Sequence, residues 1–178
     1  MVREAKLKDA QAIQNLICFY SEDGKMLFRT FEEIEQCIAD FLVFEKNNEI
    51  VGISSLKFGW DRLVEIRSLG VDPRYHRQGI ATQMIQFSIE RALLQDNCDT
   101  MFVLTYAVPL FNKLGFEIVD KIQLPQKVWN DCQACLHKDN CDETAMSLSL
   151  LSLKKLPEKE LSLRKQTLLK DTQRTLSF

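Results

Sequence analysis

The segment LVEIRSLGVDPRYHRQGIATQMIQFSIERALLQ, residues 63–95, constrains the fold of this chain more than any other. It begins as an apolar, β-branched run, turns at Asp72-Pro73, continues through a basic loop that contains Gly79, and ends in a long amphipathic pattern. A strand should therefore lead through this loop into a helix over residues 79–95. A strand, a helix and a further strand in succession predict an α+β fold with a mixed sheet.

The segments on either side supply the rest of that sheet. Turn signals at 47–49 and 59–61 separate three runs rich in β-branched and aromatic residues, as is typical of antiparallel neighbours. We predict strands near residue 2 and over 41–46, 50–58, 63–71, 100–106 and 116–122. We predict further helices over 8–20, 30–41 and 108–115, with Asp9 as an N-cap and a capping box from Thr30 to Glu33.

Length and charge limit the classes of function. The 178 residues suit one domain with a sizeable core, and a net charge of −2 gives no reason to expect binding to nucleic acid or to a membrane. The first 20 residues resemble neither a signal peptide nor a membrane span, so we expect a cytoplasmic protein with reduced cysteines. We assign residues 1–151 to the domain and 152–178, with net charge +4, to a helical or partly disordered extension.

The loop before the long helix is a candidate anion site. A helix start leaves backbone N–H groups unpaired and carries a partial positive charge. Gly79 allows a ligand to approach the backbone closely, and Arg74 and Arg77 add charge. The alternative is that these residues form only an exposed basic turn that leads into an ordinary helix.

The order of elements resembles the GNAT superfamily of N-acetyltransferases from about residue 2 to residue 151. The resemblance rests on a loop of the form [Q/R]-x-x-G-x-[G/A], with His76 at its first position, and on the later segment FNKLGF. The resemblance implies a mixed, mostly antiparallel sheet of about six to seven strands flanked by helices. It also implies that acetyl-CoA binds with its pantetheine arm on Leu69 and Val71. Its pyrophosphate would contact Arg77, Gln78, Gly79, Ile80, Ala81 and Thr82.

Four segments narrow the resemblance to amino-acid N-acetyltransferases of the N-acetylglutamate synthase type, in their short form without a kinase domain. These are LFRTFEEIEQCIADFLVFE, EIRSLGVDPRYHRQGIA, FVLTYAVPLFNKLGFEIVDK and LPQKVWNDCQACLHKDNCDETAM. The resemblance implies that Arg29 holds a carboxylate of the acceptor, and a guanidinium fits that role. Arg67 or Lys57 could bind a second carboxylate, although both could equally be solvated or paired with Asp61 and Glu65.

Acetyl transfer requires a neutral amine, so a group must accept a proton. The resemblance places Glu65 where several GNAT enzymes keep a general base, although Glu65 could instead form an ion pair with Arg67 or a lysine. A strand amide near Leu69 could donate to the developing oxyanion. The position of the tyrosine that protonates the leaving thiolate in many GNAT enzymes is Phe111, and Tyr106 is too distant for us to assign it that role.

A cluster of thiols follows the predicted sheet. Cys132, Cys135, His137 and Cys141 include a C-x-x-C spacing that can chelate zinc, but the single residue between Cys135 and His137 strains joint coordination. A redox-sensitive pair and a packed loop remain alternatives. The cluster lies between two strands, close to the amino-acid pocket in the enzymes that the chain resembles, so we prefer a wall of that pocket. We therefore assign no metal ligand.

These features predict an acetyl-CoA-dependent N-acetyltransferase that acts on the α-amino group of a small amino acid. Glutamate and glutamine are the first candidates, in arginine biosynthesis or a related modification. One alternative is a GNAT enzyme that acetylates a protein N-terminus or another amine. The other is a non-catalytic, regulatory CoA-binding module. We expect acetyl-CoA and the acceptor as the ligands and allow for a homodimer.

Overall fold

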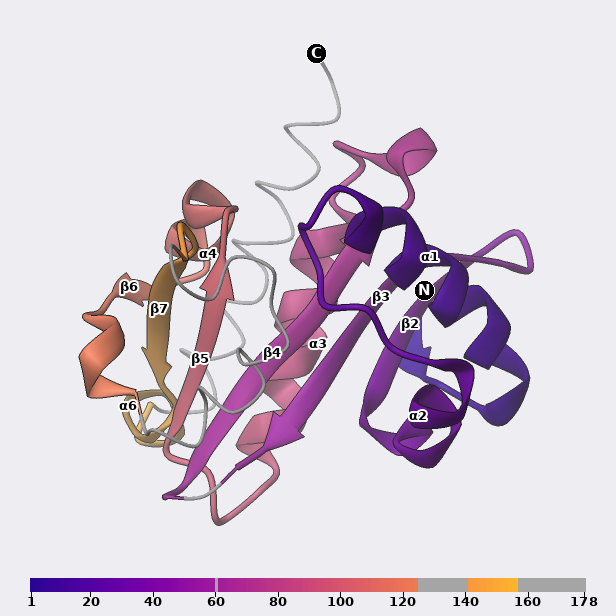
Figure 1. The fold of residues 1–178 in the computed structure, drawn as a ribbon. Helices are drawn as coiled ribbons and strands as arrows, with labels where there is room; N and C mark the ends of the chain where they lie inside the picture. Colours follow the sequence, from indigo (N-terminus) through magenta and orange to yellow (C-terminus); the bar gives the residue numbers. More distant parts are fainter. Residues whose placement is uncertain (60, 125–140, 157–178) are drawn as a thin grey trace.

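A seven-stranded sheet, in the order β1-β2-β3-β4-β5-β7-β6, organises the part of the chain that the structure describes (Figure 1). The structure is a computed structural model, and it describes residues 1–59, 61–124 and 141–156. β4 and β5 are parallel and the other neighbours are antiparallel, which confirms the predicted mixed sheet. The strands are β1 (Val2–Glu4), β2 (Phe41–Lys46), β3 (Glu49–Phe58), β4 (Leu63–Val71), β5 (Thr100–Thr105), β6 (Glu117–Ile118) and β7 (Thr144–Ser149).

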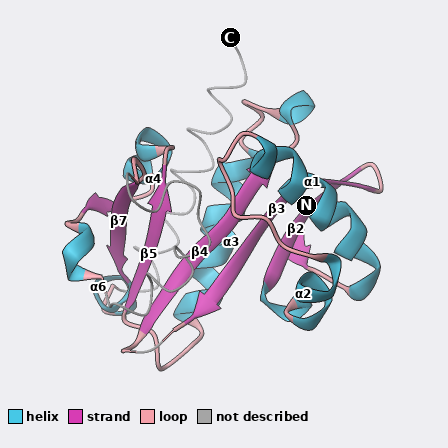
Figure 2. Ribbon diagram, viewed as in Figure 1, coloured by secondary structure: helices cyan, strands magenta, loops and turns pink. Residues whose placement is uncertain are grey.

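Helices cover both faces of this sheet (Figure 2). The helices are α1 (Ala10–Glu22), α2 (Phe31–Gln36), α3 (Ile80–Leu93), α4 (Val108–Lys113) and α6 (Leu150–Lys154). Successive residues of β2 point to opposite faces, so Phe41 and Val43 pack with α1 and α2, whereas Leu42 and Phe44 pack with α3. α4 and α6 lie on the α3 side, where Phe111 joins the largest core cluster.

The N-terminal helices differ from their predicted forms in detail. The Thr30 capping box is present, with Glu33 N–H 3.2 Å from Thr30 Oγ1, but α2 ends at Gln36 and a 3-10 turn (Ile38–Asp40) leads into β2. Asp9 precedes α1 without a side-chain capping bond. Its carboxylate instead accepts hydrogen bonds from Arg3, at 2.7 and 3.0 Å, so it ties the helix start to β1.

The C-terminal part of the domain shows the larger differences. The strand predicted over 116–122 shortens to β6, because the Asp120 side chain accepts a hydrogen bond from Ile122 N–H and closes a 3-10 turn (Lys121–Gln123). No residue range was predicted for β7, which lies between β5 and β6. α6 continues past residue 151 and buries Leu153 in the main core. Most of the extension, residues 157–178, lies outside the described residues.

Candidate functional site

The candidate site begins where β4 and β5 separate. Their pairing runs only from Leu63 with Thr100 to Glu65 with Phe102. Beyond Glu65, no strand among the described residues pairs with this edge of β4, and Figure 1 shows the two strands diverging from their lower ends. The second half of β4 therefore presents backbone groups that pair with no neighbouring strand among the described residues, and an extended ligand can use them.

A bulge in β4 sets which side chains flank this edge. Ser68 has φ +48°. Between the pairs Arg67–Ser55 and Gly70–Ile53, β4 has two residues where β3 has one. An extra residue of this kind reverses the face of the sheet to which each later side chain of the strand points. Val71 therefore packs on Ile80 of α3, whereas Gly70 turns toward α1. Without the bulge, glycine would face α3 and valine would collide with α1.

The carbonyl of Val71 points to the open edge. The N–H of Asp72 donates to the Val51 carbonyl in β3 at 2.9 Å. In a trans peptide the C=O and the following N–H point in opposite directions, so the Val71 C=O points away from β3. The alternation of a strand gives the backbone groups of Leu69 the same direction. Both residues are where the resemblance puts the pantetheine contacts.

The loop after β4 brings unpaired donors together. Gly79 has φ +72°, in the left-handed region that glycine adopts without strain, and it precedes α3 without a side-chain cap. The first intrahelical bond runs from Gln83 N–H to the Gly79 carbonyl. Among the residues that the structure describes, the N–H groups of Ile80, Ala81 and Thr82 have no acceptor. The loop therefore fits a pyrophosphate group.

The cations near this loop divide into two groups. Arg77 is exposed, and its guanidinium makes no hydrogen bond or ion pair within the described part of the chain. Arg74 is already engaged, because it pairs with Asp72 at 2.6 Å and with Glu49 at 2.5 Å. The structure thus leaves Arg77 available for a phosphate and holds Arg74 in a surface network.

Lys46, the last residue of β2, contacts this loop, and the sequence did not predict that contact. Its Nζ donates to Oε1 of Gln78 at 2.6 Å and lies 5.1 Å from the centre of the Tyr75 ring. The lysine therefore orients Gln78 and adds positive charge to the loop. The residues are 32 positions apart, so only the pairing of β2 with β3 and of β3 with β4 brings them together.

Glu65 and Arg67 lie together at the other end of the open edge. Arg67 Nε is 3.4 Å from Glu65 Oε2, and the two side chains are 11% and 13% exposed. Both project from the face opposite Val64 and Ile66, which pack in the α3 core. The ion pair considered for Glu65 is therefore present, and Lys57 is directly across from Glu65 in the neighbouring strand.

Arg29 belongs to the segment that connects α1 to α2. This segment crosses the face of the sheet that carries Glu65 (Figure 1), and Met26 Cε lies 3.3 Å from where a Cβ on Gly70 would be. Arg29 is half-buried, and its guanidinium has no hydrogen bond or ion pair with residues 1–59, 61–124 or 141–156. The Arg29 guanidinium is thus available to bind a carboxylate of the acceptor, which is the role that the resemblance implies for it.

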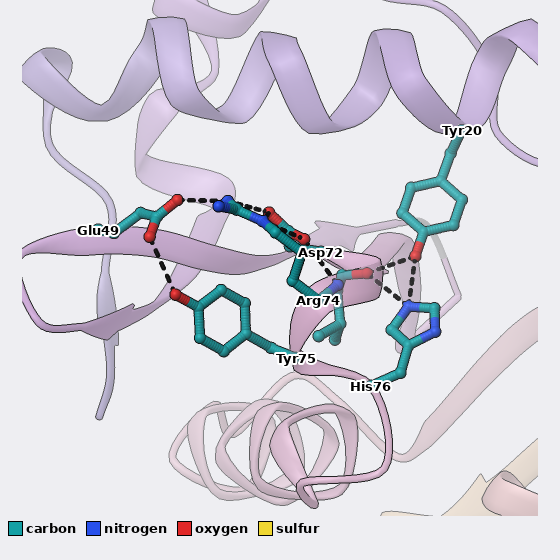
Figure 3. A network of polar contacts seen from close by, with 7 residues as sticks. Tyr20, Glu49, Asp72, Arg74, Tyr75 and His76 are labelled. Atoms are coloured by element: carbon teal, nitrogen blue, oxygen red, sulfur yellow. Dashed lines mark hydrogen bonds and ion pairs between the residues drawn. The ribbon is translucent and has the colours of Figure 1, made fainter.

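A tyrosine and a histidine meet at the end of β4 (Figure 3). The Tyr20 hydroxyl donates to the Val71 carbonyl at 2.5 Å, and Nε2 of His76 lies 2.7 Å from the same oxygen. Burial raises the pKa of Tyr20, so the hydroxyl keeps its proton. His76 therefore contacts Tyr20 of α1 and the end of β4, and the sequence did not predict these contacts.

The sequence that forms this open strand edge, glycine loop and amphipathic helix matches a known family. Residues 8–116 match the acetyltransferase (GNAT) family. The chain belongs to the GNAT family. As a GNAT protein it is an acyl-CoA-dependent N-acetyltransferase, with acetyl-CoA as co-substrate. The resemblance of the sequence to GNAT enzymes is therefore confirmed.

Two relatives and one structure show how far the likeness to this GNAT protein extends. An uncharacterized N-acetyltransferase of Chlorobaculum tepidum is 35% identical over 84% of this chain and 96% of its own length. An amino-acid acetyltransferase of Aliivibrio fischeri is 30% identical over 71% of this chain, which matches only 28% of that protein. N-acetylglutamate synthase from Neisseria gonorrhoeae, complexed with coenzyme A and N-acetyl-glutamate, has a TM-score of 0.76 at 23% identity, over 84% of this chain and 35% of that one.

The tyrosine acid of many GNAT enzymes has no counterpart at the expected position. Phe111 is 1% exposed and packs edge-to-face on Phe116, so it is a core residue. Tyr106 directly follows β5, and its hydroxyl donates to Asp142 at 2.7 Å. Burial and this carboxylate raise the pKa of Tyr106, which keeps it protonated but directs its proton to Asp142.

The cysteine cluster and the helices bear on two further predictions for this GNAT chain, on zinc and on a membrane span. Cys132, Cys135 and His137 lie outside the described residues, so zinc binding stays untested; the backbone carbonyl of Cys141 accepts from Lys121 at 2.8 Å. In the described part of the chain, none of the helices is long and apolar enough to span a membrane.

Proposed function

We propose that this GNAT enzyme transfers the acetyl group of acetyl-CoA to the α-amino group of a small amino acid, with glutamate and glutamine as the first candidates. The observation that carries the proposal is the open edge of β4. It connects an anion-binding loop at Gly79 with a carboxylate and a guanidinium at Glu65 and Arg67. The names of the relatives that acetylate amino acids support the choice of acceptor.

The coenzyme would lie along this edge. The N–H groups at the start of α3 and the Arg77 guanidinium would hold the pyrophosphate. The backbone groups of Leu69 and Val71, which face away from β3, would pair with the amides of the pantetheine arm. The reactive end of the coenzyme would then point toward Arg67 and Glu65.

The acceptor would bind on the face that carries the ion pair. Arg29 lies on the segment that crosses this face and offers a planar fork of donors to the α-carboxylate. Arg67 would bind a side-chain carboxylate or amide oxygen of the acceptor while it stays next to Glu65. These contacts would favour amino acids over amines that lack a carboxylate.

Glu65 would accept the proton of the amino group, directly or through a water molecule. The last pairing between β4 and β5 fixes its backbone, because Glu65 is opposite Phe102. An amide of β4 near Leu69 would donate to the oxygen on which negative charge develops. The leaving thiolate requires no tyrosine at position 111, since a thiol is a far stronger acid than an amine.

Steady-state kinetics of Arg29→Ala test the acceptor site. We expect the KM for the amino acid to rise about tenfold to a hundredfold, because a charged hydrogen bond contributes roughly 1.5 to 3 kcal/mol, while the KM for acetyl-CoA changes little. Lys25→Ala is the matched control, since its ammonium lies in the same segment but pairs with Asp23 at 2.9 Å. An equal rise in both KM values for Arg29→Ala would contradict the carboxylate contact.

A further inference from the structure

The Val71 carbonyl, which faces the open edge of β4, is covered by two side chains. Tyr20 Oη lies 2.5 Å and His76 Nε2 2.7 Å from this oxygen, and the two side-chain atoms are 3.0 Å apart (Figure 3). Tyr20 comes from the last turns of α1, and His76 comes from the loop before α3. Two elements that lie far apart in the sequence thus close over one backbone acceptor.

The chemistry of the three groups fixes their roles. A carbonyl oxygen can only accept, so Nε2 of His76 must carry a proton to lie this close to it. The tyrosine hydroxyl is also a donor here, because burial raises its pKa and keeps it protonated. A carbonyl oxygen has two lone pairs, and the two donors occupy both. A further N–H donor can bind Val71 only if one of them leaves.

The packing under Tyr20 shows that its position depends on the neighbouring residue of β4. A Cβ on Gly70 would lie 2.9 Å from Cε2 and 3.0 Å from Cδ2 of the tyrosine ring. Only a residue without a side chain lets the ring lie against the strand at this point. The hydroxyl therefore reaches the end of β4 because of the bulge at Ser68, which turns Gly70 toward α1.

We propose that Tyr20 is an affinity-determining residue for coenzyme A, because its hydroxyl competes with an amide N–H of the pantetheine arm for the Val71 carbonyl. This inference rests on the proposed function, which puts the pantetheine arm on the open edge of β4. His76 makes the competition effective, since it holds the second lone pair of the same oxygen. Binding of the coenzyme then replaces one hydrogen bond to the Val71 carbonyl with another, and in the free enzyme the two side chains satisfy this carbonyl.

Titration calorimetry of Tyr20→Phe with two ligands tests this proposal. Coenzyme A carries the pantetheine arm, and 3′-phospho-ADP has the same nucleotide and pyrophosphate without the arm. We expect Tyr20→Phe to bind coenzyme A roughly two- to tenfold more tightly, the factor for one net hydrogen bond, and 3′-phospho-ADP as the wild type does. Tyr75→Phe is the matched control, because this loop hydroxyl donates to Glu49 at 3.0 Å, and both affinities should stay unchanged.

A double-mutant cycle shows whether the two donors act on one oxygen. In His76→Ala a lone pair of Val71 is vacant, so adding Tyr20→Phe should change the affinity for coenzyme A by less than it does in the wild type. Unchanged or weaker coenzyme A binding by folded Tyr20→Phe, with a wild-type melting curve, would overturn the competition. If the wild type binds neither ligand, the proposed coenzyme site itself fails, which is a separate outcome.

Discussion

Replacing Glu65 with glutamine separates catalysis from structure at the centre of the site. The substitution preserves the size of the side chain and removes its ability to accept a proton from an ammonium group. It also leaves the Arg67 guanidinium, 3.4 Å away, beside a neutral amide. Glu65→Gln should therefore lower both the rate of acetyl transfer and the stability of the fold, by amounts that can be estimated independently.

The contact between Arg67 and Glu65 sets the stability effect. At 3.4 Å and an effective dielectric constant of about 20, the attraction is about 5 kcal/mol. Desolvation of two side chains that are only 11% and 13% exposed offsets much of it. The amide oxygen can still accept a hydrogen bond, so we expect the free energy of unfolding to fall by about 1 to 3 kcal/mol. The loss of a general base should lower kcat on the order of a hundredfold or more.

Coenzyme A release at neutral pH gives kcat, and denaturant unfolding gives the stability. The variant Glu65→Gln/Arg67→Met is the control, because it removes both members of the pair and should recover part of the stability without recovering the rate. If Glu65→Gln keeps a rate within a few-fold of the wild type while it loses stability, Glu65 is a structural partner of Arg67 and the base must be sought elsewhere.

Three further predictions concern the loop and the N-terminus. Gly79→Asp should abolish calorimetric binding of coenzyme A by placing a carboxylate against the pyrophosphate, whereas Gly79→Ala should still bind at a stability cost of about 1 to 2 kcal/mol for a side chain at φ +72°; equal binding by both would refute the anion site. Lys46→Met should weaken coenzyme A binding by roughly fivefold and reduce its dependence on salt, because the ammonium 2.6 Å from Gln78 is lost; an unchanged salt dependence would exclude Lys46 from the loop. The hydrogen bond from Arg3 lowers the pKa of Asp9, so its contribution to stability is complete above the unfolded value of about 4 and is lost as the pH falls through the lower folded value. Asp9→Asn should therefore lower the urea midpoint at pH 7 and lose less on acidification than the wild type; parallel pH profiles would contradict this.

The elements with strong periodic patterns were predictable from the sequence. α3 lies within two residues of its predicted bounds, because its apolar stripe packs on the sheet as an amphipathic helix should. β7 was missed because TAMSLS contains small and polar residues, and its strand conformation depends on pairing with β5. The prediction for 116–122 was too long because Asp120 ends the strand with a local hydrogen bond.

The candidate site was predictable only where its residues are close in sequence. The loop around Gly79 has a pattern of its own, and the structure gives it the expected unpaired donors. Tyr20 and Lys46 come from other elements, 51 residues from Val71 and 32 from Gln78, and nothing in their local sequence links them to the loop. The bulge at Ser68 was also missed, since a serine at φ +48° has no distinctive sequence signal here.

Analysis of the reaction product shows whether this enzyme acetylates the α-amino group of an amino acid. The purified chain is incubated with acetyl-CoA and each amino acid in turn, and the mixture is examined by mass spectrometry for an N-acetylated amino acid and for free coenzyme A. We predict that both form in equal amounts with glutamate or glutamine, and that neither forms at a comparable rate with Glu65→Gln. Release of coenzyme A without an acetylated amino acid, or no product with any amino acid, would contradict the proposed function.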